Sequence, residues 1–223
     1  QYHGFPEVEF HVMALEDLPQ LGLSFDYINC DEMLYLLPDP VAGLQAMKAV
    51  LHPEGIIRAN LHSFYQRIDF FFFLEMARPL GLMDVNPAQR ECDFIRNIMS
   101  DLRDTVMLKA GTWIPSVQTN EFMMVNYFMH GDKGHTIPDM FHMLSEAGLK
   151  FISMVSKSEW DITNLLKDKL NISPDFDNFL KDASDEQRLH LYELLHPFNR
   201  LLDFWCSHEG ERESSTPIPA WNR

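Results

Sequence analysis

The 223-residue chain has few cysteines and few basic residues. Its three cysteines, Cys30, Cys92 and Cys206, follow neither a metal-binding spacing nor a paired disulfide pattern, which favours a reducing cytoplasmic compartment. Lysine and arginine number 18 against 33 acidic residues, so the net charge is −15, and no basic cluster occurs in the sequence. Because phosphate binding needs clustered Lys and Arg, the composition argues against a nucleic-acid partner.

Long apolar runs and several catalytic motifs are also missing. The run of four phenylalanines at 70–73 is flanked by Asp69 and Glu75 and is far shorter than the roughly 20 residues of a membrane span, so we expect no transmembrane helix. No P-loop, Gly-x-Ser-x-Gly or His-Glu-x-x-His pattern occurs, and we expect no metal site. The ten glycines never form Gly-x-Gly.

The segment 25–61 reads as strand, acidic loop, helix and strand. Residues 25–30 are largely apolar, as in a strand of a parallel sheet. Asp39 is a good helix N-cap, and Pro40 suits the first helical position. Apolar residues then recur at helical spacing to Leu51, and the segment 56–61 returns as a strand. The order predicts an α/β fold with a right-handed crossover.

This segment resembles the fourth and fifth strands of the class I S-adenosylmethionine-dependent methyltransferases. Residues 8–13, followed by Glu16-Asp17-Leu18-Pro19, resemble the third strand and the adenine-side loop of that family, and the segment 132–155 resembles its late helix and strand. The resemblance implies a partial Rossmann-like sheet with a helical insertion and a helical C-terminal appendage. It also implies S-adenosylmethionine as cofactor and a small molecule or a protein as methyl acceptor.

The resemblance also assigns site residues. The cofactor-binding candidates follow the third and fourth strands and are Leu15, Glu16, Cys30, Asp31 and Glu32. Asp31 or Glu32 could equally cap the loop or the next helix. Ala14 stands where the family often has an Asp that recognises adenine. The residues that follow the fifth strand are expected to face the acceptor: His62 as a general base or as a hydrogen-bonded loop histidine, and Asn60, Ser63, Tyr65 and Arg67 as substrate-binding residues.

The family's first strand with its Gly-rich turn, and the acidic end of its second strand, have no counterpart in this sequence. Both would lie between the third and fourth strands of the sheet. We therefore expect the chain to be a fragment, inactive by itself, in which residues 8–13 pack abnormally or are poorly anchored.

The remaining sequence is mostly helical. The segments 63–82 and 87–107 have helical spacing, and we expect two or three helices there. We also expect a helix within 140–149 followed by a strand over 150–155, and a helix from Ser184 to about Cys206. We expect residues 1–62 and 131–160 to form the sheet domain. Residues 63–130 would be a helical insertion, which forms either extra core or a substrate lid. A helical appendage would follow over 161–208, and a polar tail over 209–223.

Two other functions remain open. A catalytically inactive scaffold would have kept the sheet and lost the cofactor site, and Ala14 is consistent with this. A nicotinamide-dependent Rossmann enzyme would require a Tyr-Lys or His-Asp arrangement downstream, which the sequence does not display.

Overall fold

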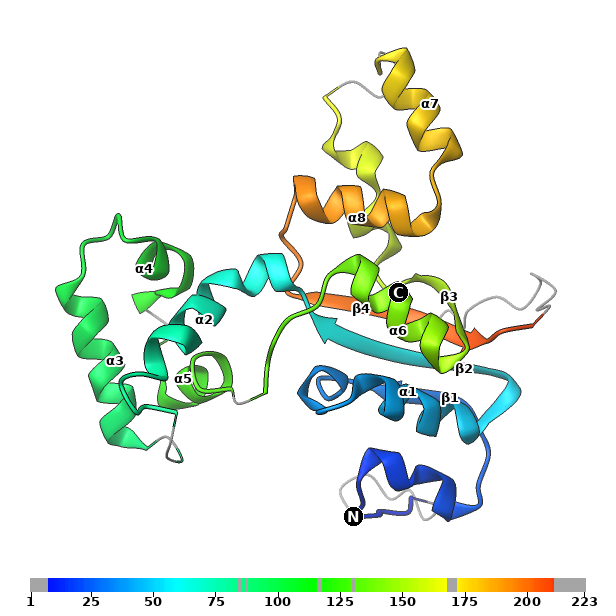
Figure 1. The fold of residues 1–223 in the computed structure, drawn as a ribbon, viewed down its shortest axis with the longest axis horizontal. Helices are drawn as coiled ribbons and strands as arrows, with labels where there is room; N and C mark the ends of the chain where they lie inside the picture. Colours follow the sequence, from blue (N-terminus) through cyan, green and yellow to red (C-terminus); the bar gives the residue numbers. More distant parts are fainter. Residues whose placement is uncertain are drawn as a thin grey trace.

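The computed structural model describes residues 8–83, 86, 88–115, 118–129, 131–167 and 172–210. Its centre is a four-stranded sheet with the order β1-β2-β4-β3 (Figure 1). Strands β1 (Phe25–Cys30) and β2 (Leu51–His62) are parallel, whereas β4 (Leu201–His208) runs antiparallel to both β2 and β3 (Leu149–Met154). The expected α/β class is confirmed, with one antiparallel strand inside the sheet.

The crossover between β1 and β2 forms as predicted. Helix α1 (Pro40–Ala49) begins after Asp39, whose side chain accepts hydrogen bonds from the N–H groups of Val41 and Ala42. Helix α6 (Ile137–Ala147) begins at a Thr136–Asp139 capping box and ends at Gly148, which has φ 64°. Both helices pack on the same face of the sheet (Figure 1). They bury a core built around Leu44, Met47, Met140, Ile57, Leu61 and Phe204.

Helix α2 (Phe64–Ala77) follows β2 directly and leads into the helical insertion. It is joined by α3 (Gln89–Asp101), α4 (Met107–Thr112) and α5 (Asn120–Asn126). These helices enclose a second core of eight buried residues that includes Phe73, Ile95, Met99 and Tyr127. The segment 87–107, predicted from its helical spacing, is not helical throughout, because the chain turns between Arg103 and Val106 and separates α3 from α4.

The C-terminal region differs most from the prediction. Short turns of 3-10 helix at Lys157–Trp160 and Ile162–Leu165 lead to α7 (Pro174–Asp182) and α8 (Asp185–Leu195). The helix predicted from Ser184 to about Cys206 is wrong beyond Leu195, since His196 precedes a proline and leaves the helical conformation, with φ −146° and ψ 74°. Residues 201–208 then form β4 and belong to the sheet rather than to a helical appendage.

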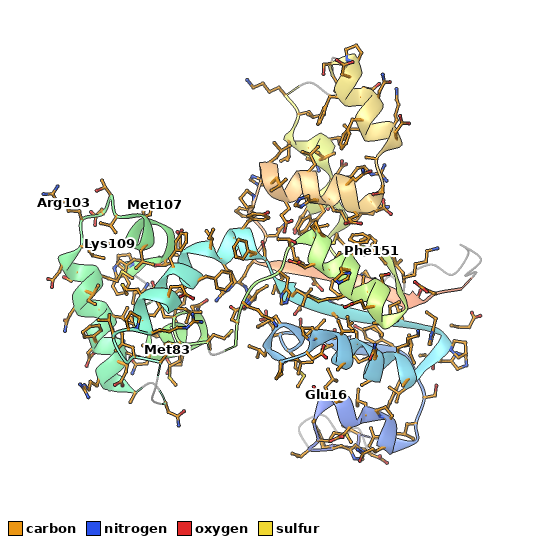
Figure 2. The ribbon with its side chains drawn as sticks, viewed as in Figure 1. Glu16, Met83, Arg103, Met107, Lys109 and Phe151 are labelled. Carbon is orange, nitrogen blue, oxygen red and sulfur yellow. The ribbon has the colours of Figure 1, made fainter. Side chains whose placement is uncertain are left out.

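The strand expected over 8–13 does not form. Residues 8–14 adopt neither helix nor strand, and the side chains of Phe10 and Val12 are exposed. Within the described residues β1 pairs only with β2, so the segment has no strand beside it. The exposure agrees with the expectation that this segment is poorly anchored. A 3-10 helix, η1 (Leu15–Leu21), follows and packs beside α1, where Glu16 lies (Figure 2).

The predicted polar tail lies outside the described residues from position 211 onward. No helix in the described part of the chain is long and apolar enough to span a membrane.

Candidate active site

The carboxyl ends of β1 and β2 bring the predicted site residues together. The two strands are parallel and Cys30 pairs with Ala59, so the loop after β1 meets the last residues of β2. Asn60 is fully buried at this junction. Its Nδ2 donates to Asp31 Oδ1 at 2.6 Å, and its Oδ1 accepts from the backbone N–H of Glu32 at 2.9 Å. Asn60 therefore fixes the acidic loop.

The Glu32 side chain lies between two polar side chains, Tyr35 and Arg200. The hydroxyl of Tyr35 donates to Glu32 Oε2 at 2.5 Å, and the guanidinium of Arg200 donates to both carboxylate oxygens. Burial alone would raise the pKa of Glu32, but the hydrogen bonds from Arg200 and Tyr35 hold it below its usual value. Glu32 is thus a carboxylate that forms an ion pair with Arg200 and holds its guanidinium in place.

The backbone of Glu32 is strained, and the strain can be measured. Its φ is 55°, a value that is costly for a residue with a Cβ. Glu32→Gly and Glu32→Ala remove the same side-chain contacts and differ at the backbone. We expect Glu32→Gly to have the larger free energy of unfolding, by about 1 kcal/mol, in urea titrations followed by circular dichroism. Equal stability of the two variants would contradict the argument.

His62 is fully buried at the end of β2. Its Nδ1 lies 2.8 Å from Asp132 Oδ2, and its Nε2 lies 3.0 Å from Arg200 Nη1. The ring of Tyr35 stacks on the imidazole, with 3.6 Å between ring centroids and 20° between planes. Burial lowers the pKa of His62, as do Arg67 and Arg200, while Asp132 opposes the shift. His62 is therefore neutral near pH 7.

Asp132 joins His62 to a second buried cation. Arg67 Nε donates to Asp132 Oδ2 at 3.0 Å, and Arg67 Nη1 donates to Asn126 Oδ1 at 3.3 Å. The Asp132 and Arg67 side chains are each 1% exposed. Although burial raises the pKa of Asp132, His62 and Arg67 together hold it below the usual value. The set Asp132, His62 and Arg67 is a buried charge network that ties α2 to the loop before α6.

Two buried histidines make stability depend on pH. Burial lowers the pKa of both His62 and His135 from 6.5, and neither ring nitrogen of His135 has a hydrogen-bond partner among the described residues. Below about pH 6.5 the unfolded chain binds protons that the folded chain does not. The free energy of unfolding therefore decreases as the pH is lowered, by up to about 1.4 kcal/mol per pH unit for each histidine.

We expect the protein to be less stable at about pH 5.5 than at about pH 7.5, and His135→Leu to reduce this difference. Urea titrations at the two pH values measure it. Glu193, whose pKa is raised by burial, contributes with the opposite sign, so the comparison with His135→Leu is the decisive one. An unchanged difference in that variant would refute the assignment to His135.

The other predicted residues lie in different surroundings. Ser63 is the N-cap of α2, since its Oγ accepts from the N–H of Gln66 at 3.3 Å. Cys30 is buried, and burial raises the pKa of its thiol to about 11. Tyr65 is half-buried and its ring contacts Phe64 edge to face. Glu16 is exposed on η1, whereas Leu15 packs against the sheet core.

Three residues of the site were not predicted from the sequence: Tyr35, Asp132 and Arg200. Asp132 and Arg200 are 70 and 138 positions from His62, so no local spacing links them to it. The sequence feature that could have identified Asp132 as a site residue was its position in the polar segment 132–136, directly before a capped helix. Arg200 directly precedes the apolar run at 201–206, which was assigned to a helix.

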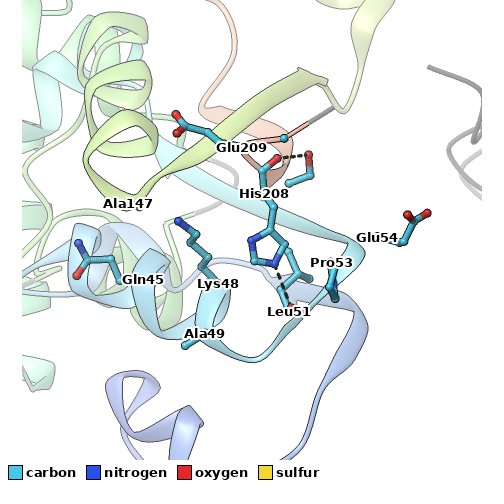
Figure 3. A pocket seen from close by; sticks show the side chains of 11 residues that line it. Gln45, Lys48, Ala49, Leu51, Pro53, Glu54, Ala147, His208 and Glu209 are labelled. Atoms are coloured by element: carbon cyan, nitrogen blue, oxygen red, sulfur yellow. Dashed lines mark hydrogen bonds between the residues drawn. The ribbon is translucent and has the colours of Figure 1, made fainter. Parts of the chain in front are cut away.

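A cavity of about 930 Å³ opens at the opposite end of the sheet (Figure 3). It lies between the ends of α1 and α6 and the start of β2, and Lys48, Ala147 and His208 line it. The ring of His208 donates to the carbonyl of Leu51 at 3.1 Å. Open α/β sheets bind ligands at the carboxyl ends of their parallel strands. We therefore take the surroundings of His62, and not this cavity, as the candidate active site.

The chain is similar to several known proteins. An uncharacterized protein of Synechococcus, syc1184_c, is 26% identical over 225 residues, which cover 96% of this chain and 50% of that protein. A tRNA U34 carboxymethyltransferase of Campylobacter jejuni is 38% identical over 50 residues, or 22% of this chain and 17% of that protein. The chain therefore spans at most about half the length of these curated relatives.

A solved structure shares the fold. PKMT2 from Rickettsia typhi, determined in complex with AdoHcy, superimposes with a TM-score of 0.65 at 15% identity and covers 90% of this chain and 39% of that one. The family model described as a methyltransferase domain matches residues 1–125, more than half of the sequence. On this match and the shared α/β architecture, the chain belongs to the methyltransferase-domain family.

Proposed function

We propose that the protein transfers a methyl group from S-adenosylmethionine to a small molecule or a protein side chain, with His62 as the general base. One observation carries this proposal: a buried neutral histidine, bonded to Asp132, stands beside the acidic loop of β1 at the carboxyl ends of two parallel strands. This is the edge at which such sheets bind ligands. We place the protein in the cytoplasm, on the basis of its three free, buried cysteines.

The residues present fit part of the cofactor. Leu15, Leu34 and Leu37 converge on Gly43 of α1, where an added Cβ would lie 2.5 Å from Leu37 Cδ1 and 3.1 Å from Leu15 Cδ2. These leucines are suited to cover the adenine, and Glu16 stands beside them. Asp31, Glu32 and Cys30 would lie next to the cofactor at the end of β1. When bound, S-adenosylmethionine would supply a methyl group on a sulfonium for in-line displacement.

The ribose and methionine parts need elements that the 223 residues do not contain, since the sequence has no Gly-x-Gly turn. We propose that the chain is an incomplete fragment and that residues preceding it in the whole protein supply them. The proposed division keeps 1–62 and 131–160 as the sheet domain, now joined by β4, with 63–130 as a cover that selects the acceptor.

The residues of this chain would act on the acceptor. His62 Nε2 takes the proton from the attacking atom, and Asp132 stabilises the imidazolium that forms. Asn60 holds Asp31 and Glu32 in place. Ser63 and Tyr65, at the start of α2, would contact the acceptor, while Arg67 would act on it through Asp132. The acceptor is not a nucleic acid in this proposal, because the net charge is −15 and the sequence has no basic cluster that could bind phosphates.

Calorimetric titration of S-adenosylhomocysteine tests the proposal. We expect binding by a form extended at the N-terminus and little or none by the 223 residues alone. In the extended form, Asp31→Ala should weaken binding, whereas Asp26→Ala, also at β1 and 96% exposed, should not. Absence of binding by both folded forms would overturn the proposal in favour of the inactive scaffold. Binding of NADH in its place would favour a nicotinamide enzyme.

A further inference from the structure

Arg200 occupies an unusual place between the acidic loop and the proposed base. It directly precedes β4, and its backbone carbonyl accepts from the N–H of Ser63 at 2.9 Å. Its guanidinium donates to both oxygens of Glu32, and its Nη1 also reaches His62 Nε2 at 3.0 Å. One side chain therefore contacts the loop of β1 and the end of β2.

The contact with Arg200 determines where His62 carries its proton. A guanidinium has only donors, so His62 Nε2 must accept and must be unprotonated. The ring proton is then on Nδ1 and is donated to Asp132 Oδ2 at 2.8 Å. The basic lone pair that a general base needs thus points at Arg200 and is occupied by it.

The other groups around His62 are buried. Tyr35 stacks on the ring and is 2% exposed, and the Asp132 and Arg67 side chains are each 1% exposed. The side chain of Arg200 is 44% exposed. Of the polar side chains that contact the ring in the described residues, Arg200 is the one in contact with solvent. Access from solvent to Nε2 is therefore controlled by Arg200.

Displacing the Arg200 side chain from His62 costs less free energy than separating Asp132 from Arg67. Its ion pair with Glu32 is between half-exposed side chains, and solvent screening leaves such pairs with little net contribution to stability. Glu32 would keep the hydrogen bond from Tyr35. By contrast, Asp132 and Arg67 could not separate without leaving a buried charge unpaired.

We propose that Arg200 is a movable cover and positioning residue for His62: it holds the imidazole in the Nδ1–H form, occupies Nε2, and must leave before an acceptor reaches the base. The inference rests on the proposed function, since it assigns a control of that same site. Whether Arg200 blocks His62 Nε2 can be measured without cofactor or acceptor.

Diethyl pyrocarbonate, which modifies unprotonated imidazole nitrogens, is a suitable probe. We expect Arg200→Ala to accelerate modification of His62 at least about tenfold at neutral pH, as followed by peptide mass spectrometry, because the bonded nitrogen becomes free. Arg200→Lys, which can still donate to Nε2, should stay close to the wild type. His142, whose side chain is 73% exposed on α6, is the internal reference and should react equally in all forms.

Glu32→Gln provides a second variant, should Arg200→Ala fail to fold. It releases Arg200 from its carboxylate and should also accelerate modification of His62. Nitrogen-15 spectra of the ring should show His62 protonated at Nδ1 in the wild type. A wild-type ring protonated at Nε2, or equal His62 rates in the wild type and the folded variants, would overturn the inference. If the cover is confirmed while S-adenosylhomocysteine binds neither the 223 residues nor the extended form, the proposed function falls and the cover stands.

Discussion

Asp132→Ala is expected to lower the free energy of unfolding by about 3–5 kcal/mol. Asp132 accepts from both His62 and Arg67, and all three side chains are at most 1% exposed. Its removal leaves the Arg67 cation buried without a carboxylate partner among the described residues, with hydrogen bonds to Asn126 and a contact with the Phe70 ring remaining. Urea titrations of wild type and variant, followed by circular dichroism, measure the difference.

Asp185→Ala is the matched control for a surface pair. Asp185 accepts from Arg188 at 2.8 Å on α8, but its side chain is 61% exposed. Water and ions screen such a pair, so the expected change is about 0–1 kcal/mol. A loss at Asp132 no larger than that at Asp185 would show that the buried network adds nothing to stability.

The second large effect concerns catalysis. His62→Asn is expected to reduce methyl transfer by about 10²–10⁴-fold in a form that binds S-adenosylhomocysteine. The asparagine amide can still donate to Asp132 near the position of Nδ1, but it cannot take a proton from the acceptor. Transfer of labelled methyl groups to a panel of amines, phenols, carboxylates and peptides identifies the acceptor and gives the rate.

His142→Asn is the control, because His142 lies on the exposed side of α6. It should retain wild-type rates, and both variants should bind S-adenosylhomocysteine with unchanged affinity. Full activity of His62→Asn would exclude proton transfer to His62 as a required step. Loss of both binding and activity would instead indicate that the variant disturbs the fold.

Capping residues and short apolar runs in the sequence correctly predicted the start of α1 and the strand over 25–30. Asp39 and Pro40 define the start of α1 by side-chain capping and fixed φ, and the strand 25–30 was placed correctly. The strand at 8–13 failed for a non-local reason. Its apolar residues form a strand only beside a partner, and β1 does not pair with it.

β4 was missed because its pattern is ambiguous. Leu201, Leu202, Phe204 and Trp205 are spaced as on a helix, but a strand buried on both faces in the middle of a sheet carries a similar apolar run. The proline at 197 was the available signal for a break. The helix was nevertheless predicted through this proline, because apolar residues continue at helical spacing on both sides of position 197.

The site was predictable only where it follows a strand. The family resemblance assigned His62, Asn60, Asp31 and Glu32 to the ends of two strands. The structure brings them together because parallel strands end at a common edge. Asp132 and Arg200 contact His62 through tertiary packing alone. Arg67 was expected to be a substrate-binding residue, whereas its guanidinium is buried against Asp132. Its role toward an acceptor stays a prediction.

The position of β4 has a consequence for synthesis on the ribosome. Within the described residues β3 pairs only with β4, which follows it by 46 residues along the chain, from Met154 to Leu201. As the chain emerges, β3 has no strand partner until β4 has left the exit tunnel, and β2 lacks its neighbour on that side. Long-range pairings of this kind form slowly and leave strand edges open to other chains. The nascent protein is therefore expected to need chaperone protection until its C-terminal strand is made.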